Sequence, residues 1–140
     1  MKNLRLVLVA LTALLMATAV QAQQTRVKAN VPFGFVAGDH YYPAGEYSLK
    51  SVYGLDSFIQ IANTQEDGAA NVVSIACTAA QPSEQTKLVF WRMGDTYFLS
   101  QIWTAGRSYG REFPKSRAEL RLAQNHEKPE LVIVAANISQ

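Results

Sequence analysis

The feature that most constrains the fold is a pair of apolar, aromatic runs joined by two turn residues. The runs cover Lys87–Met93 and Thr96–Thr104, and Gly94-Asp95 lies between them. A glycine first in a two-residue connection favours a type II′ hairpin turn, whose twist matches that of the flanking strands. The turn predicts four facing pairs: Met93 with Thr96, Arg92 with Tyr97, Trp91 with Phe98, and Phe90 with Leu99.

Both faces of this hairpin are expected to be apolar, because side chains alternate between the faces of a strand. The predicted faces are Met93, Trp91, Phe98, Val89 and Ile102 on one side, and Phe90, Leu99, Leu88 and Trp103 on the other. A strand pair that is apolar on both faces must be covered on both sides. We therefore expect the hairpin to form the centre of the fold.

Short strand-like runs fill most of the remaining chain, and turn residues separate them. These runs are Arg26–Val31, Phe33–Val36, Glu46–Tyr53, Phe58–Ala62, Asn71–Cys77 and Leu131–Ala136. Pro32 interrupts the first two and suits an edge strand or a bulge. The last run is long enough for one buried strand. Short strands at regular spacing predict a mainly β fold, a seven- to eight-stranded antiparallel sandwich, with a small barrel as the alternative.

One short C-terminal helix is expected after the strands. Ser116-Arg117-Ala118-Glu119 is a capping box, in which the serine and the glutamate each satisfy a free amide at the helix start. Asn125 is a plausible end. Because about ten residues cannot hold a helix in water alone, we expect Ala118, Leu122 and Leu120 to lean on the sheet. The helix either plugs an open end of the fold or covers an outer face of the hairpin.

The first 22 residues are typical of a secretory signal peptide. Lys2 and Arg5 flank an apolar run, and Val20-Gln21-Ala22 supplies the small residues of a cleavage site before Gln23. We therefore expect a signal peptide at 1–22 and a single β domain at 23–140, exported to the periplasm or the extracellular space. No later stretch approaches the ~20 apolar residues of a membrane span, so the exported domain is not expected to span a membrane.

Charge gives no argument for a nucleic-acid partner. The chain has 13 basic and 11 acidic residues, and two of the basic residues lie in the signal peptide. The exported domain is therefore electrically balanced, whereas nucleic-acid-binding domains carry a basic surface.

Five stretches resemble those of small exported β-proteins found in soil bacteria. They are Val31–Gly38, Pro43–Tyr47, Lys87–Phe90, Gly94–Leu99 and Gly110–Ser116. The likeness covers most of the exported domain and implies a shared small β fold behind a signal peptide. That family is uncharacterised and has no established activity, so the resemblance implies no catalytic residue.

Motifs for catalysis, metal binding and cofactor binding are absent from the sequence. It contains neither a G-x-S-x-G elbow nor a phosphate-binding glycine loop. His40 and His126 are far apart and have no cluster of further ligands nearby. The single cysteine, Cys77, is expected to be a small core hydrophobe, with a reactive thiol or an intermolecular bridge as alternatives. We expect no cofactor, no metal and no enzymatic activity.

One polar cluster is a candidate binding site. Its members are Arg107, Arg111, Lys115, Ser116, Arg117 and Arg121, and only two glutamates lie among them. With the free amides of the helix start, this patch is suited to an anionic glycan, a phosphate, a lipid headgroup or another anionic component of the cell envelope. The alternative is an ordinary solvated loop and helix face.

These observations favour an exported, non-catalytic β module that binds or scaffolds in the cell envelope or outside the cell. The first alternative is a small β-barrel that carries an apolar ligand, because both faces of the central hairpin are apolar and barrels can enclose one small ligand. The second is a small hydrolase that uses His40 or His126.

Overall fold

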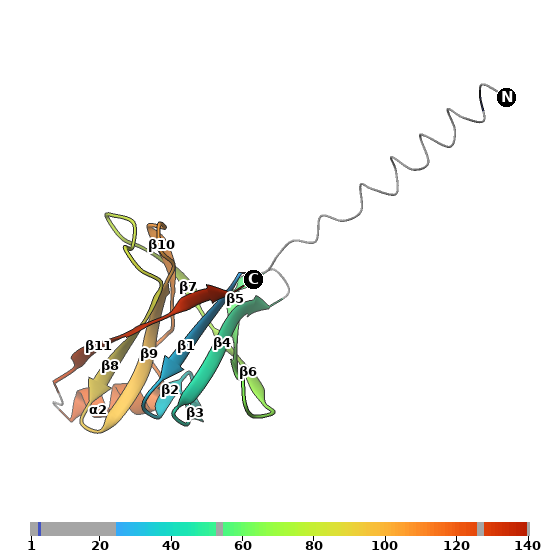
Figure 1. Cartoon of the computed structure of the whole chain (residues 1–140). Coiled ribbons are helices and arrows are strands. Elements are labelled where there is room, and N and C mark those ends of the chain that lie inside the picture. Colours follow the sequence, from blue (N-terminus) through green and yellow to red (C-terminus); the bar gives the residue numbers. More distant parts are fainter. Residues whose placement is uncertain (1–2, 4–24, 53–54, 126–127, 140) are drawn as a thin grey trace.

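The computed structural model of the protein describes residues 3, 25–52, 55–125 and 128–139. In this part of the chain two β-sheets pack against each other, and one short helix lies beside them (Figure 1). The predicted mainly β sandwich with one late helix is therefore confirmed. The barrel alternative is wrong, because the described strands form two separate sheets and no closed one.

The predicted signal peptide lies outside the described residues, apart from Asn3. Among the residues that the structure describes, none belongs to a helix that is long and apolar enough to cross a membrane.

The first sheet has the strand order β12-β1-β4-β5-β6. Its strands are β1 (Arg26–Val31), β4 (Gly45–Val52), β5 (Leu55–Asn63), β6 (Ala69–Val73) and β12 (Asn137–Ser139). All of its pairings are antiparallel. Because β1 lies between β12 and β4, the edge position suggested by Pro32 is wrong. Pro32 instead follows the last residue of β1, where the chain leaves this sheet.

The second sheet has the order β11-β8-β9-β10-β7, and a small hairpin joins it beside β9. Its strands are β2 (Phe35–Ala37), β3 (His40–Tyr42), β7 (Ile75–Thr78), β8 (Lys87–Met93), β9 (Thr96–Trp103), β10 (Tyr109–Glu112) and β11 (Glu130–Ala135). The pairing of β2 with β9 is parallel, whereas the others are antiparallel.

The described chain has twelve strands, more than the seven or eight predicted, because continuous runs break where the chain crosses between sheets. The run Asn71–Cys77 divides at Ser74 into β6 of the first sheet and β7 of the second. The buried Ser74 ties this corner to β5: its amide donates to the Ser57 carbonyl at 2.8 Å, and its hydroxyl donates to the Asp56 carbonyl at 2.6 Å.

The central hairpin has the predicted register, and all four expected pairs are confirmed. One β-bulge shifts the pairing farther from the turn, because Leu99 faces Phe90 but Gln101 faces Val89, which leaves Ser100 as an extra residue. Two predicted positions are therefore wrong: Ile102 belongs to the inner face and Trp103 to the outer face.

The hairpin is covered on both faces, as expected. Its inner side chains, Leu88, Phe90, Leu99 and Ile102, belong to the core between the sheets. Its outer side chains Val89, Met93, Phe98 and Trp103 are buried as well.

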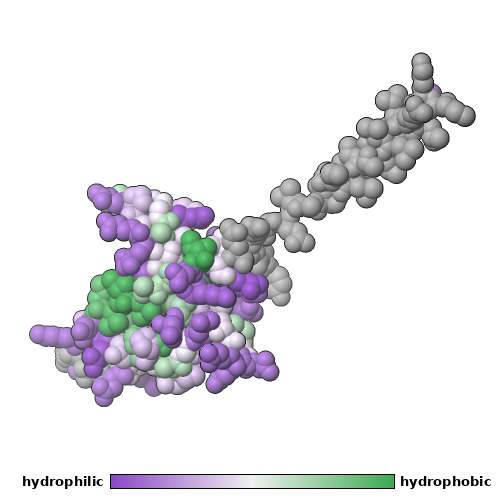
Figure 2. Space-filling view, in the orientation of Figure 1, coloured by the Kyte–Doolittle hydropathy of each residue, from purple (hydrophilic) through white to green (hydrophobic). Residues whose placement is uncertain are grey.

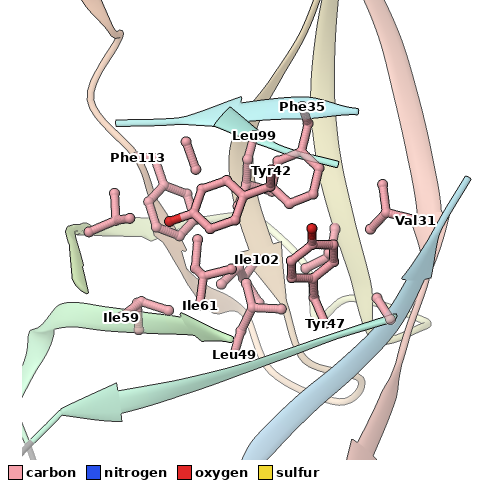
Figure 3. Close-up of a cluster of buried hydrophobic side chains, with 14 of the residues drawn as sticks. Val31, Phe35, Tyr42, Tyr47, Leu49, Ile59, Ile61, Leu99, Ile102 and Phe113 are labelled. Atoms are coloured by element: carbon pink, nitrogen blue, oxygen red, sulfur yellow. The ribbon is translucent and has the colours of Figure 1, made fainter. Parts of the chain in front are cut away.

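Aromatic rings fill the end of the sandwich at which β2 and β3 lie (Figures 1 and 3). Phe35 stacks on Tyr42 with ring centroids 5.1 Å apart and meets Tyr47 edge-on at 5.2 Å. Phe33 stacks on Tyr97 at 3.8 Å. Such contacts add stability beyond the burial of apolar area. We call the region that contains these five rings the closed end.

The helix α2 (Arg117–Gln124) begins and ends as the sequence predicts. The Ser116 hydroxyl accepts a hydrogen bond from the Glu119 amide at 3.1 Å, and Asn125 is the C-terminal cap. The predicted contact stripe is wrong in part, because Leu122 is half-buried but Ala118 and Leu120 are exposed. Glu119 is buried instead, since the capping box turns its side chain back toward the helix start.

The last apolar run forms an edge strand rather than a buried one. In β11, Val132 and Val134 pack against the core, whereas Leu131 and Ile133 are about half exposed, at 52% and 47%. A short apolar run does not by itself distinguish an edge strand from a central one, which explains the wrong prediction.

Candidate binding site

A pocket opens at the end of the sandwich opposite the aromatic rings, and we call this region the open end. The pocket lies between the start of β1, the end of β4 and the start of β5 on one side, and β7, β9 and β10 on the other. Its volume is about 540 Å³. Small-molecule sites commonly measure about 300–1,000 Å³, so a small organic ligand fits.

The floor of this pocket is aliphatic. It consists of inward-facing side chains from both sheets, and each is less than a tenth exposed: Val27, Leu49, Ile59 and Ile102. Figure 3 shows Leu49, Ile59 and Ile102 among the buried side chains between the two sheets. A ligand group placed on this floor would lose contact with water, which favours an apolar group.

The wall and rim of the pocket carry a positive excess. Lys50, Arg107 and Arg111 line it, and Asp56 is its one acidic lining residue. The Asp56 carboxylate accepts a hydrogen bond from the Ser51 hydroxyl at 2.7 Å. The electrostatic environment of the pocket therefore favours an anion.

Arg111 is an arginine on the inner face of a sheet. It faces Ile102 across β9 and Ala76 across β7, and both of these residues also line the pocket. Its Nε donates to the Ser74 hydroxyl at 3.0 Å, and its Nη2 donates to the Ser74 carbonyl at 2.8 Å. Both partners are neutral, so they fix the position of the guanidinium without neutralising its charge.

Arg107 lies on the rim and is held by an aromatic neighbour. Its guanidinium carbon is 5.4 Å from the centre of the Tyr109 ring, and its Nη1 donates to the Tyr109 hydroxyl. The backbone around Arg107 is fixed too, because its carbonyl accepts from the Ser83 amide and the Gly106 amide donates to the Ser83 carbonyl. The rim cation is therefore positioned before any ligand arrives.

Neither arginine has a carboxylate partner in the part of the chain that the structure describes. The one ion pair there joins Arg92 Nη1 to Glu130 Oε2 at 3.7 Å, on another part of the second sheet. A partly buried charge gains most from a partner that brings the opposite charge. The pocket thus offers two guanidinium groups to an incoming anion.

The predicted basic patch is divided between two pockets. Arg107 and Arg111 line the open-end pocket, whereas Lys115, Ser116 and Arg117 line another pocket of about 410 Å³ beside His40. Arg121 lines neither. The Ser116 hydroxyl already accepts from the helix amide of Glu119, so it serves the helix itself.

Buried Glu119 lies beside this second pocket. Burial raises the pKa of its carboxyl, while the charge of Lys115 and a hydrogen bond from the Ser116 backbone act in the opposite direction. Lys115 therefore has an acidic neighbour at the helix start, which reduces the positive character of the second pocket.

The remaining predicted candidates are dispersed. His40 is exposed in β3, and His126 lies outside the described residues. Among the described residues, no group of three or more His, Cys, Asp and Glu is placed to hold a metal ion.

Cys77 is half-buried opposite Gly110 and lies outside the core, so its predicted core position is wrong. Burial and the charge of Glu112 raise the pKa of its thiol, which disfavours the reactive thiolate.

A third pocket, which the sequence did not predict, lies on the outer face of the second sheet, and we call it the outer hollow. The loop Ala79–Gln85 and the side chains of Trp103, Leu131 and Ile133 border it, and its volume is about 460 Å³. Figure 2 shows an apolar patch in the region of β11. This hollow lacks the paired arginines of the open end.

Sequence reasoning identified Arg107 and Arg111 but missed the rest of the open-end pocket. Lys50 and Asp56 lie more than fifty residues before them in the sequence, and no local motif marks them. The alternation of β1 and β4 did indicate which residues face inward, yet it could not show that the sheets leave a space there.

Comparison with protein-family models, with curated proteins and with solved structures finds no match for this chain. The geometry of the open-end pocket is therefore the main guide to what the protein does.

Proposed function

We propose that the protein is an exported, non-catalytic binding module whose open-end pocket holds a small, partly apolar ligand. The observation that carries this proposal is the pocket of about 540 Å³ with an aliphatic floor between the sheets. The leader at residues 1–22 supports an action in the periplasm or outside the cell.

The composition of the pocket supports binding rather than catalysis. Its lining contains no histidine and no cysteine, and its single carboxylate is hydrogen-bonded to Ser51. A hydrolase needs a nucleophile or an activated water together with a positioned base. The one hydroxyl–carboxylate contact in the lining joins Ser51 to Asp56, and no lining histidine stands beside it to relay a proton. The hydrolase alternative therefore receives no support from this site.

The test uses protein isolated from the exported fraction of a bacterium that expresses the full chain. The probe is N-phenyl-1-naphthylamine, a neutral apolar dye that fluoresces when it leaves water. We expect saturable binding of one dye per chain. Ala76 lines the pocket, so Ala76→Phe should fill the site and weaken binding at least tenfold.

The matched control is Ala118→Phe, which places the same ring on the exposed helix surface. It should leave the dye affinity unchanged. Absence of saturable binding would contradict the proposal. So would dye binding that survives Ala76→Phe but is lost in Ile133→Lys, because that result places the dye in the outer hollow.

A further inference from the structure

We infer that the ligand of the open-end pocket is an amphiphile with an aliphatic chain and an anionic head group, of the kind that a fatty acid carboxylate represents. This inference rests on the proposed binding function of the same pocket. It adds the chemical class of the ligand and the residues that select it.

The chain part of such a ligand matches the floor. The four floor residues are aliphatic, and the one aromatic lining residue, Tyr109, stands on the rim beside Arg107. All the close ring–ring contacts of the described chain involve six residues of the closed end and the inner hairpin: Phe33, Phe35, Tyr42, Tyr47, Phe90 and Tyr97. The pocket therefore offers dispersion contacts with methyl and methylene groups rather than a stacking platform.

The head group is selected by the two arginines. Arg111 uses Nε and Nη2 on Ser74, and Arg107 uses Nη1 on Tyr109. Each guanidinium carries five N–H donors, so each keeps donors for a further partner. A carboxylate accepts from guanidinium groups through two oxygens and forms charge-assisted hydrogen bonds that are stronger than neutral ones.

The positions of the two arginines also predict the orientation of the ligand. Arg111 stands on the inner wall beside Ile102, at the boundary between the aliphatic floor and the polar wall. Arg107 stands on the rim, in the segment just before β10. The aliphatic chain thus enters first, and the head group stays at the mouth between Arg111 and Arg107.

The experiment measures the binding of three dodecyl compounds to the exported protein by calorimetry. They share one chain and differ in the head group: dodecanoate, dodecan-1-ol and dodecyltrimethylammonium. We expect dodecanoate to bind about tenfold more tightly than the alcohol, because only the carboxylate gains charge-assisted hydrogen bonds. The ammonium compound should bind more weakly than the alcohol.

Two substitutions locate the head group. Arg107→Gln should lower the affinity for dodecanoate about fivefold and leave the alcohol unaffected, since its neighbour Tyr109 stays in place. Arg121→Gln is the control, because Arg121 belongs to the same basic stretch of the sequence but does not line the pocket. Arg111→Gln should lower the dodecanoate affinity further, and its alcohol affinity reports whether the pocket is still folded.

Equal affinities for dodecanoate and dodecan-1-ol would overturn the inference, as would an equal loss in Arg107→Gln and Arg121→Gln. In those cases a neutral dye that still binds and is still excluded by Ala76→Phe would leave the proposed binding function standing. If neither the dye nor any dodecyl compound binds, both the inference and the proposed function fail.

Discussion

The two ends of the sandwich are built from the same sheets but are filled in opposite ways. At the closed end the rings of Phe35, Tyr42 and Tyr47 pack at centroid distances of 5.1–5.7 Å. At the open end the sheets enclose a pocket of about 540 Å³ that is lined by Arg107 and Arg111. Dense aromatic packing is therefore concentrated at one end of the core, and the open space lies at the other.

The separation has a physical reason. Protein interiors are close-packed, and an unfilled space costs stability in proportion to its size. A fold that leaves a space at one end needs dense packing elsewhere to remain folded. The aromatic cluster supplies that packing, since each aromatic side chain buries about 150–250 Å².

Two isoleucines on one face of β5 test most directly whether the two ends of the sandwich are packed differently. Ile61 is completely buried, whereas Ile59, two residues earlier, lines the pocket. We expect Ile61→Ala to lower the free energy of unfolding by about 4 kcal/mol and Ile59→Ala by about 2 kcal/mol, because the second deletion enlarges an existing space. Urea denaturation measures both values. Equal losses would mean that the two ends are packed alike.

Gly110 tests how closely β10 must approach β9 at the open end. A Cβ atom at this position would lie 2.5 Å from the Ile102 carbonyl oxygen and 2.9 Å from the Trp103 ring. Gly110→Ala should therefore cost about 2–3 kcal/mol of stability through overpacking. It should also weaken dodecanoate binding, since Arg111 is the next residue. Ser108→Ala, in the exposed segment before β10, is the control and should change neither quantity.

Two tyrosines of the closed end differ in the hydrogen bonding of their hydroxyl groups. The Tyr47 hydroxyl donates to the Pro43 carbonyl at 2.6 Å, whereas the buried Tyr42 hydroxyl has no partner among the described residues. Tyr47→Phe should cost about 1 kcal/mol, and Tyr42→Phe should be neutral or stabilising by up to about 1 kcal/mol. Thermal and urea unfolding at pH 7 check the signs, and a clear loss in Tyr42→Phe would contradict this account.

Alkaline pH gives a second test of Tyr42. Burial, and then the nearby Tyr47, raise the pKa of Tyr42 from 10.0 to about 12. The unfolded chain therefore loses this proton near pH 10, while the folded chain keeps it until about pH 12. The stabilising effect is complete below pH 10 and is lost between pH 10 and 12, by up to about 1.4 kcal/mol per pH unit. Urea unfolding across this range should show a steeper loss in the wild type than in Tyr42→Phe, and equal slopes would mean that Tyr42 is not buried.

The smallest stability loss is expected at the cap of α2. Removing this cap tests whether the helix and the open-end pocket are independent. Ser116→Ala removes the hydroxyl that caps α2 and should cost about 1 kcal/mol. Because Ser116 lies outside the open-end pocket, dodecanoate affinity should be unchanged in the folded variant. A parallel loss of affinity would show that the helix and the pocket are coupled.

Local rules predicted the local features. Gly94-Asp95 defined the hairpin register, and Ser116 with Glu119 defined the helix start, because turns and caps depend on residues a few positions apart. The division at Ser74 and the bulge at Ser100 were not predictable in this way. Both depend on how two sheets meet, and the bulge alone decides that Ile102, and not Trp103, reaches the pocket.

Of the candidate site, only two of the three basic lining residues were predicted. Arg107 and Arg111 were identified by charge, yet the sequence grouped them with Lys115, Arg117 and Arg121, which lie elsewhere. The cause is geometric, because the four-residue strand β10 lies between Arg107 and Lys115 and carries the chain away from the mouth of the pocket. Neighbours in sequence thus point to different parts of the surface.

The corner at Ser74 has one further consequence. This single small residue binds β5 through its amide and hydroxyl hydrogens and receives the Arg111 guanidinium through its two oxygens. The spacing of the two sheets at this corner therefore depends on the hydrogen bonds of one residue, whereas four side chains build the aliphatic floor. A larger side chain in place of Ser74 would therefore change the separation of the two sheets at this corner while leaving every floor residue in place.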